Sequence, residues 1–283
     1  MRSRPIAYSG EPGAFAEDAV IAAFGDVERS GLAGFRAVFE AVTAATARAG
    51  VVPIESLVAG TVREVYDLLL EFELGIVGEV VVPVELCLAA LPGARLEDVE
   101  RVYSHVQALG QAERFLRGRS WSLLTTYNTA GAGRMIVDAG ERGAASVLSR
   151  RAAAALGLEV LADSIEDVPG NRTRFVVVAA PDDPATRPVI PGGPARTTIA
   201  FAVRNEPGTL LAALRAFAGR GINLSKLESR PSRVAAWEYV FLADLDAAAD
   251  SAACADALAE LAAVTTMVRV LGSYPRAVEP GPA

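Results

Sequence analysis

The first 180 residues alternate short apolar runs with segments of helical spacing, and this alternation constrains the fold more than any other feature. Short apolar runs bounded by turn residues predict strands, and apolar residues three and four positions apart predict helices. Strands that alternate with helices predict an α/β architecture with largely parallel sheets, and the spacing leaves open one sheet or two. The expected strands are 6–8, 51–54, 76–88, 101–103, 121–125, 144–148 and 175–179, and the expected helices are 14–24, 35–48, 61–72, 107–117, 129–138 and 149–156.

The pattern changes after residue 180. The stretch APDDPATRPVIPGGPAR is rich in Pro and Gly and predicts a linker over residues 181–196. Residues 197–275 then follow the order βαββαβ, which is the ferredoxin-like arrangement. Its expected strands are 197–203, 223–229, 237–244 and 264–271, and its expected helices are 210–220 and 248–261. The Pro-rich tail at 276–283 is expected to lack regular structure.

Composition narrows the class of protein. Hydrophobic residues make up 52% of the chain, which is ample for buried cores, and the net charge of −7 argues against nucleic acid as a partner. Cys87 and Cys254 lie far apart in apolar surroundings, which predicts buried free thiols. The N-terminus lacks the apolar core of a signal peptide, and no apolar run is long enough to span a bilayer. We therefore expect a cytoplasmic protein with neither a nucleic-acid nor a membrane partner.

Two loops that follow strands carry polar or flexible residues. The segment SGEPGAFAEDA places two glycines before a helix, whose first N–H groups could bind an anion. The segment VVPIES places Glu55 and Ser56 directly after a buried strand, where ligands gather in open α/β sheets. Taken alone, the first segment is better explained as an ordinary turn between a strand and a helix. Glu55 in the second segment is better explained as a solvated loop acid. Thr61 is a possible cap of the following helix.

Further polar residues stand out later in the chain. His105 is the only histidine, and with no partner histidines or suitably spaced cysteines it predicts no metal site. We interpret His105 as structural, and Gln107 as either a substrate contact or a helix cap. The segment NRTRF precedes a buried strand, so Thr173 and Arg174 point in opposite directions once that strand has begun. A cation and a hydroxyl there suit a carboxylate substrate, and a surface turn is equally compatible.

The order of the motifs is more specific than any single one. From about residue 4 to 275 the chain resembles bacterial prephenate dehydratases fused to an ACT regulatory domain. GEPGAF, VVPIES with AGTV and YDLLL, SHVQAL, NTAGAG and NRTRF resemble successive blocks of the catalytic region. PGTLL, NLSKLESRP and WEYVF resemble the ACT portion almost letter for letter.

The chain departs from the family pattern at a few positions. The family's P-I-E-N-S segment aligns its Asn with Ser56 and its Ser with Leu57 when no gap is placed. With a gap of one residue, Ser56 matches the family Ser and the Asn is missing. Ala16 replaces the usual Ser or Thr, and Val106 replaces a frequent Pro. These changes remove polar groups from a site expected to bind two carboxylates, and they affect substrate binding rather than the fold.

The resemblance implies an α/β fold with a two-lobed, periplasmic-binding-protein-like catalytic region over residues 1–180. One lobe would comprise 1–83 with 166–180 and the other 84–165, with crossovers near Pro83 and Ile165. A ferredoxin-like ACT domain over 197–275 would follow the linker at 181–196, with a tail at 276–283.

The resemblance also implies the chemistry. Prephenate would lose its carboxylate and ring hydroxyl together, and aromatisation would drive the reaction without a metal or other cofactor. Thr173 would donate a hydrogen bond to the departing hydroxyl, Glu55 would supply a proton if burial raises its pKa, and Arg174 would serve as a cation or brace the strand. The substrate-binding residues would be Gly13, Ala14, Phe15, Ser56, Gln107 and Asn171.

For regulation, the resemblance implies a phenylalanine site between two ACT domains, and hence a homodimer or homotetramer. The effector-binding residues would be Asn205, Gly208, Thr209, Leu210, Leu211, Glu228 and Ser229. A cut near Gly192 is expected to give a catalytic fragment that phenylalanine does not inhibit. Two alternatives remain open, namely an arogenate dehydratase with the same fold and a non-catalytic amino-acid sensor.

Overall fold

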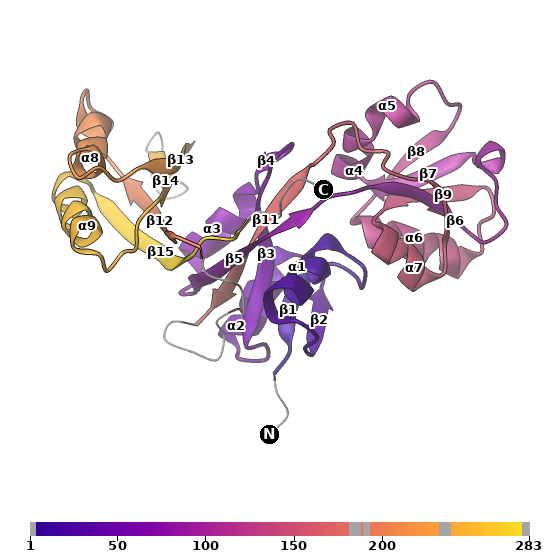
Figure 1. Cartoon of the computed structure of the whole chain (residues 1–283), viewed down its shortest axis with the longest axis horizontal. Helices are drawn as coiled ribbons and strands as arrows, with labels where there is room; N and C mark the ends of the chain where they lie inside the picture. The colour runs from indigo at the N-terminus through magenta and orange to yellow at the C-terminus, as the bar shows by residue number, and fades with distance from the viewer. Residues whose placement is uncertain (1–3, 181–187, 189–192, 232–238, 279–283) are drawn as a thin grey trace.

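The structure, a computed structural model, describes residues 4–180, 188, 193–231 and 239–278. Its strands form three sheets that follow one another along the long dimension of the molecule (Figure 1). In the order of the chain, we call the first sheet with its helices lobe 1, the second lobe 2, and the third the C-terminal unit; lobe 1 lies between the other two (Figure 1). Among the described helices, none has both the length and the apolar content that crossing a bilayer demands.

Lobe 1 has the strand order β2-β1-β3-β11-β5, and the short β4 pairs with β3. β1 runs parallel to β2 and β3, whereas β11 runs antiparallel to β3 and β5. The elements are β1 (Ile6–Ser9), α1 (Phe15–Phe24), β2 (Arg29–Leu32), α2 (Phe35–Thr43), β3 (Ala49–Ser56), β4 (Gly60–Thr61), α3 (Arg63–Glu71), β5 (Gly75–Pro83) and β11 (Arg172–Ala179).

Lobe 2 has the strand order β10-β6-β9-β7-β8 and is also mixed, because β6 runs antiparallel to both of its neighbours. The elements are β6 (Cys87–Ala90), the 3₁₀ helix η1 (Leu96–Asp98), β7 (Arg101–His105), α4 (Val106–Gln111), α5 (Glu113–Leu116), β8 (Ser122–Thr126), α6 (Thr129–Ala139), β9 (Ala144–Leu148), α7 (Arg150–Leu156) and β10 (Glu159–Ala162).

The C-terminal unit confirms the predicted βαββαβ order, with all its strands antiparallel in the order β13-β14-β12-β15. The elements are β12 (Ala195–Ala202), α8 (Thr209–Ala218), β13 (Leu224–Pro231), β14 (Tyr239–Leu245), α9 (Ala252–Val264) and β15 (Met267–Pro275). β12 begins at Ala195, two residues before the expected start of this strand at Thr197. Most of that linker, the tail after residue 278 and the first two residues of the expected strand 237–244 lie outside the described residues.

The predicted α/β class and two-lobed region are confirmed, but the expectation of largely parallel sheets is wrong. The chain leaves lobe 1 after Pro83 and returns to it with β11, and a returning strand runs antiparallel to its neighbours. The expected strand 76–88 is therefore divided between two sheets. The two connecting segments are bonded where Val84 N–H donates to Asn171 O at 2.8 Å and Ile165 N–H donates to Leu86 O at 3.0 Å.

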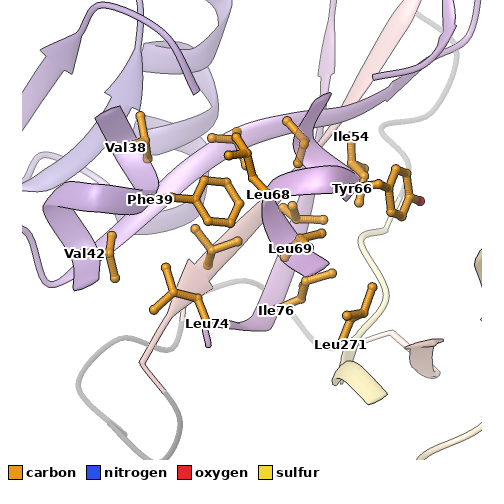
Figure 2. Packing of buried hydrophobic residues seen from close by; sticks show 14 of the residues in the cluster. Val38, Phe39, Val42, Ile54, Tyr66, Leu68, Leu69, Leu74, Ile76 and Leu271 are labelled. Carbon is orange, nitrogen blue, oxygen red and sulfur yellow. The ribbon is translucent and has the colours of Figure 1, made fainter. Parts of the chain in front are cut away.

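The two faces of the lobe 1 sheet are covered differently. On the α1 face, Phe175 and Val177 of β11 pack against α1. On the opposite face, which we call the α2/α3 face, Val176 and Val178 pack in a second core. Figure 2 shows this second core, in which Phe39 and Leu68 come from the covering helices and Leu271 comes from β15. The C-terminal unit is therefore part of the core of lobe 1.

Candidate functional site

Thr173 lies on the α1 face of lobe 1, at the end of β11 nearest to lobe 2. It is half-buried and pairs across the sheet with Ser56, the last residue of β3. Paired residues on neighbouring strands share a face, so the Thr173 and Ser56 side chains point the same way. Ser56 Oγ accepts the N–H of Ala59 at 3.2 Å, which fixes the turn into β4. The structure thus brings these two expected site residues together.

The loop before α1 approaches this face, but its amides are engaged within the loop. Gly13 N–H donates to the Glu17 carboxylate at 2.7 Å, and Ala14 N–H donates to Glu11 O at 3.0 Å. The Phe15 ring packs against the cores of both lobes. The expectation that these three residues offer amides to a carboxylate is therefore wrong for Gly13 and Ala14 in this conformation, because Glu17 and Glu11 already accept those donors.

The two lobes contact each other at this loop. Ser149 Oγ, at the start of α7, donates to Gly13 O at 3.2 Å. Arg151 donates to Glu17 at 2.9 Å and also to Asp18. Burial raises the pKa of Glu17. Hydrogen bonds from Arg29, Gly13 and Arg151 lower that pKa by a larger amount, so the net shift is downward. A charged Glu17 therefore links the α1 loop to lobe 2 at neutral pH.

Gln107 lies in α4 of lobe 2, and Asn171 contacts the end of that helix. Asn171 is buried, and its side-chain amide donates to Gln111 Oε1 at 3.2 Å. Its Oδ1 atom is also buried and has no hydrogen-bond partner among the described residues. Gln107 is exposed, and its N–H donates to His105 Nδ1 at 3.3 Å. The helix cap is therefore His105, whose pKa burial lowers, and the Gln107 side chain remains available to a substrate.

Arg174 lies on the α2/α3 face, away from Thr173. Its guanidinium donates to Glu55 at 2.8 Å, to Asp244 of β14 at 2.8 Å and to Glu79 of β5 at 3.1 Å. Burial lowers the pKa of Arg174, but Asp244, two tyrosines and Glu79 raise it by more, so the net shift is upward. The expectation that Arg174 is a catalytic cation is wrong in this conformation, because its guanidinium is already bound by three carboxylates on the face opposite to Thr173. The alternative that it braces the strand agrees with the structure.

Glu55 belongs to the group of charged residues around Arg174, which we call the ion cluster. One of its carboxylate oxygens accepts from Arg174 and the other from Lys226 Nζ of β13 at 2.9 Å. Burial raises the pKa of Glu55. Lys226 and Arg174 lower that pKa by a larger amount, so the net shift is downward. The expectation of a raised pKa and a proton-donating role is therefore wrong. Glu55 is charged at neutral pH because two cations bind it.

The ion cluster continues into the C-terminal unit. Arg196 of β12 donates to both oxygens of Glu79, at 3.0 and 2.8 Å, and Thr198 Oγ1 donates to Asp244 at 2.7 Å. A cavity of about 470 Å³ opens beside the cluster. Its lining comprises Glu55, Ser56, Leu57, Gly60, Glu79, Val81, Gly170, Arg172, Arg174, Arg196, Ser225, Lys226, Asp244, Arg276 and Ala277.

Sequence reasoning missed Glu79, Asp244 and Lys226. A signal for the two acids was present, because each interrupts an otherwise apolar strand, GIVGEVVVP and YVFLADL. A charge within a buried strand implies a buried partner. The sequence could not identify that partner, because Arg174 lies 70 residues from Asp244 along the chain.

The expected effector residues are divided between the two faces of the C-terminal sheet. Asn205 is exposed in the turn before α8, and Leu211 is exposed in the first turn of that helix. Thr209 Oγ1 donates to Arg204 O and Glu206 O in the same turn, and Leu210 packs into the core beneath the helix. Gly208 has a φ of 87°, a conformation that favours glycine.

Ser229 is exposed on the edge strand β13, whereas Glu228 points to the opposite face and accepts from Thr61 Oγ1. The Glu228 side chain therefore does not join the others, because neighbours on a strand alternate. Thr61, expected as a helix cap, instead lies in β4, and α3 is capped at Val62.

Comparisons with known proteins cover nearly the whole chain. The family model described as "Prephenate dehydratase" matches residues 6–183, and the ACT domain model matches residues 197–263. Arogenate dehydratase 1 of Petunia hybrida is 40% identical, over 97% of this chain and 68% of the relative.

Two solved structures resemble the chain closely. A prephenate dehydratase from Arthrobacter aurescens in complex with L-Phe is 33% identical with a TM-score of 0.86, over 96% of this chain and 90% of that one. GqqA, described as a novel type of quorum-quenching acylase, is 33% identical with a TM-score of 0.85, over 97% and 98% of the two chains.

Proposed function

The chain belongs to the prephenate dehydratase family, and from this premise we propose that it acts on prephenate itself and is inhibited by phenylalanine. The family reaction is a decarboxylating dehydration. The bond from the ring to the carboxylate breaks and releases carbon dioxide, and its electron pair enters the ring. The ring then expels its hydroxyl, which leaves as water after taking up one proton. Aromatisation of the ring supplies the driving force.

Thr173 is the residue that we assign to the departing hydroxyl. It stands at the end of β11 beside Ser56, on the face where the two lobes meet. A preorganised hydroxyl donor stabilises the charge that develops on a leaving oxygen. Because Glu55 is charged and lies on the opposite face, we assign the required proton to solvent, relayed through the Thr173 hydroxyl. Ser56, Gln107 and Asn171 are proposed to orient the substrate.

The observation that carries the proposal is the collinear match of both family models, together with the pairing of Thr173 and Ser56. The decisive experiment incubates the purified full-length chain with prephenate and, separately, with arogenate. We expect phenylpyruvate from prephenate at a kcat/KM above that for arogenate. Faster release of phenylalanine from arogenate would instead support an arogenate dehydratase, a candidate that the Petunia relative favours.

Two further arms separate the remaining functions. Turnover of neither substrate, with phenylalanine binding retained, would indicate an amino-acid sensor without catalysis. An acylase assay is included because of the similarity to GqqA. Acyl cleavage that Thr173→Ala leaves unchanged would show an activity separate from the dehydratase site.

For regulation, we propose that phenylalanine binds on the helix side of the C-terminal sheet, near Gly208, Leu211 and Ser229, at an interface between two copies of this chain. The Arthrobacter relative in complex with L-Phe supports the choice of ligand. Phenylalanine can inhibit only if it binds the less active arrangement more tightly. Calorimetry on the intact protein should show binding, and the melting temperature should rise with phenylalanine. The absence of a heat of binding would contradict this assignment.

Localisation in the cytoplasm also remains a prediction.

A further inference from the structure

Lys226 is the only lysine in the chain, and the other 26 of the 27 basic residues are arginines. It lies in β13, at the interface between the C-terminal unit and lobe 1. Its side chain is only 10% exposed. A chain that otherwise uses arginine for its cations has a lysine at one of its most buried charged positions. The surroundings of Lys226 explain why an ammonium suits this position.

The Lys226 ammonium is enclosed by groups from lobe 1. It donates to Glu55 Oε1 at 2.9 Å and to Thr61 Oγ1 at 2.8 Å, and it lies 5.4 Å from the centre of the Tyr66 ring. An ammonium is compact and points three donors in different directions, whereas a guanidinium is planar and wider. Two acceptors and an aromatic ring this close to one nitrogen therefore suit lysine better than arginine.

The groups that Lys226 binds belong to the strands that carry the proposed active site. Glu55 immediately precedes Ser56 in β3, and Thr61 of β4 pairs with Glu55. The second oxygen of Glu55 accepts from Arg174, which immediately follows Thr173. Lys226 is therefore joined through one carboxylate to both strand ends that hold Ser56 and Thr173.

On its other side, Lys226 is connected to the segment proposed to bind the effector. Glu228 lies two residues further along β13 on the same face and accepts from Thr61 Oγ1, the group that Lys226 also binds. Ser229, on the opposite face, is the next residue. A displacement of β13 at Ser229 would therefore move Glu228 and Lys226 together, because they belong to one strand.

We propose that Lys226 is a positioning residue that the C-terminal unit contributes to the dehydratase site, and that effector binding acts by withdrawing it from Glu55 and Thr61. The first part concerns catalysis alone, and the second part rests on the proposed inhibition by phenylalanine. Two experiments on the full-length protein test these parts separately.

The first experiment compares Lys226→Met with Arg269→Met. Arg269 also crosses the interface, donating to Leu70 O at 2.8 Å and Phe72 O at 2.6 Å, but it does not contact Glu55. Loss of a hydrogen bond to a charged group supports an effect of about tenfold. We expect Lys226→Met to lower kcat/KM for prephenate about tenfold, and Arg269→Met to change it by less than about threefold. Lys226→Arg should behave like Lys226→Met.

Equal losses in Lys226→Met and Arg269→Met would show that Lys226 only holds the interface together, and would overturn the first part. Unchanged activity in Lys226→Met would also overturn it. For the second part, Lys226→Met should raise the phenylalanine concentration for half-inhibition at least about fivefold, the lower end of typical allosteric coupling. Calorimetric affinity for phenylalanine should remain within about threefold of the parent.

The second experiment uses the unaltered protein, so it does not depend on any variant folding. Acetylation of the single ε-amine is followed by mass spectrometry of the peptide that contains Lys226. We expect slow acetylation without phenylalanine and at least about fivefold faster acetylation at saturating phenylalanine. An unchanged or slower rate in protein that calorimetry shows to be loaded would overturn the release of Lys226. Protein that binds no phenylalanine would contradict the proposed regulation and the release, while the kinetic comparison would still decide the positioning role.

Discussion

At the scale of single residues, Thr173 and Arg174 are adjacent in the chain and act on opposite sides of one sheet. Thr173 shares the α1 face with Ser56, and Arg174 binds Glu55, Glu79 and Asp244 on the other face. The residue next to the hydroxyl is thus a largely buried arginine whose guanidinium binds three carboxylates. We infer that Arg174 acts through the position of the strand and not by touching the substrate.

Thr173→Ala should lower kcat for prephenate about a hundredfold or more, because one preorganised donor is lost. Thr173→Ser keeps the hydroxyl and should retain more activity than Thr173→Ala. Steady-state kinetics with prephenate check both. Thr46→Ala, at an exposed turn of lobe 1, is the matched control and should match the parent. Near-parental turnover by Thr173→Ala would remove Thr173 from the mechanism.

Glu55→Gln tests the charged state of the Glu55 carboxyl. The pKa of Glu55 is lowered in the folded state, so its contribution to stability is present above its ordinary pKa of about 4.3 and is lost as the pH falls through the lowered pKa. The parent should therefore melt higher than Glu55→Gln at about pH 7, and this difference should shrink at about pH 3.

The effect of Glu55→Gln should be small, about 1 kcal/mol or less, because the carboxylate is partly exposed to solvent. Glu97→Gln, in an exposed pair with Arg95, is the control. A difference in melting temperature between the parent and Glu55→Gln that grows on acidification would show a raised pKa instead.

At the scale of elements, the loop before α1 and the start of α7 form the contact between the lobes. Ser149 bonds Gly13, and Arg151 bonds both Glu17 and Asp18. These bonds hold α1, which covers the Thr173 face, against lobe 2. The two lobes are therefore held together by a few polar contacts, one close backbone approach and the Phe15 ring, which packs against both cores.

Gly13→Ala should disturb this contact. Gly13 has a φ of 95°, and an added Cβ would lie 2.8 Å from Ala152 Cα of α7. We expect a loss of about 1–3 kcal/mol in the free energy of unfolding, with a lower kcat/KM. Gly25→Ala is the matched control, since it has a φ of 72° and open space around its Cβ. Equal destabilisation in both variants would show that backbone strain, and not contact between the lobes, decides the effect.

At the scale of the whole molecule, the C-terminal unit is packed into lobe 1. Leu271 and Tyr274 of β15 lie in the core on the α2/α3 face, and Glu79 is buried between Arg174 and Arg196. Removing one partner of a buried ion pair costs about 3–5 kcal/mol. A fragment that ends before Ala195 is therefore expected to be unstable, which revises the expectation that it is merely insensitive to phenylalanine.

Gly272→Ala tests the same interface in the intact chain. A Cβ on Gly272 would lie 2.2 Å from Ile76 O, so β15 would have to move away from β5. Overpacking of this kind should cost about 1–3 kcal/mol, and chemical denaturation measures it. Gly110→Ala, in a helix with open space around its Cβ, is the control and should be neutral or stabilising. If Gly272→Ala has the same free energy of unfolding as the parent, β15 and β5 do not pack as closely as this contact requires.

The sequence by itself determined most of the elements, their order along the chain and the family. Hydrophobic periodicity depends on neighbouring residues, so it located most helices and strands and the βαββαβ unit. It missed β2, β4 and β10, which are short or exposed. It also ran α4 and α5 together, because the break at Ala112 leaves the apolar spacing intact.

Only the tertiary structure decided which partners each polar side chain has on its side of the sheet. The NRTRF segment predicts that Thr173 and Arg174 diverge, but the partners of Arg174 come from β3, β5 and β14. The raised pKa expected for Glu55 was wrong for the same reason, because its neighbour Lys226 lies 171 residues away along the chain. Burial and charge pairing depend on contacts between distant segments, and local sequence patterns contain no record of those contacts.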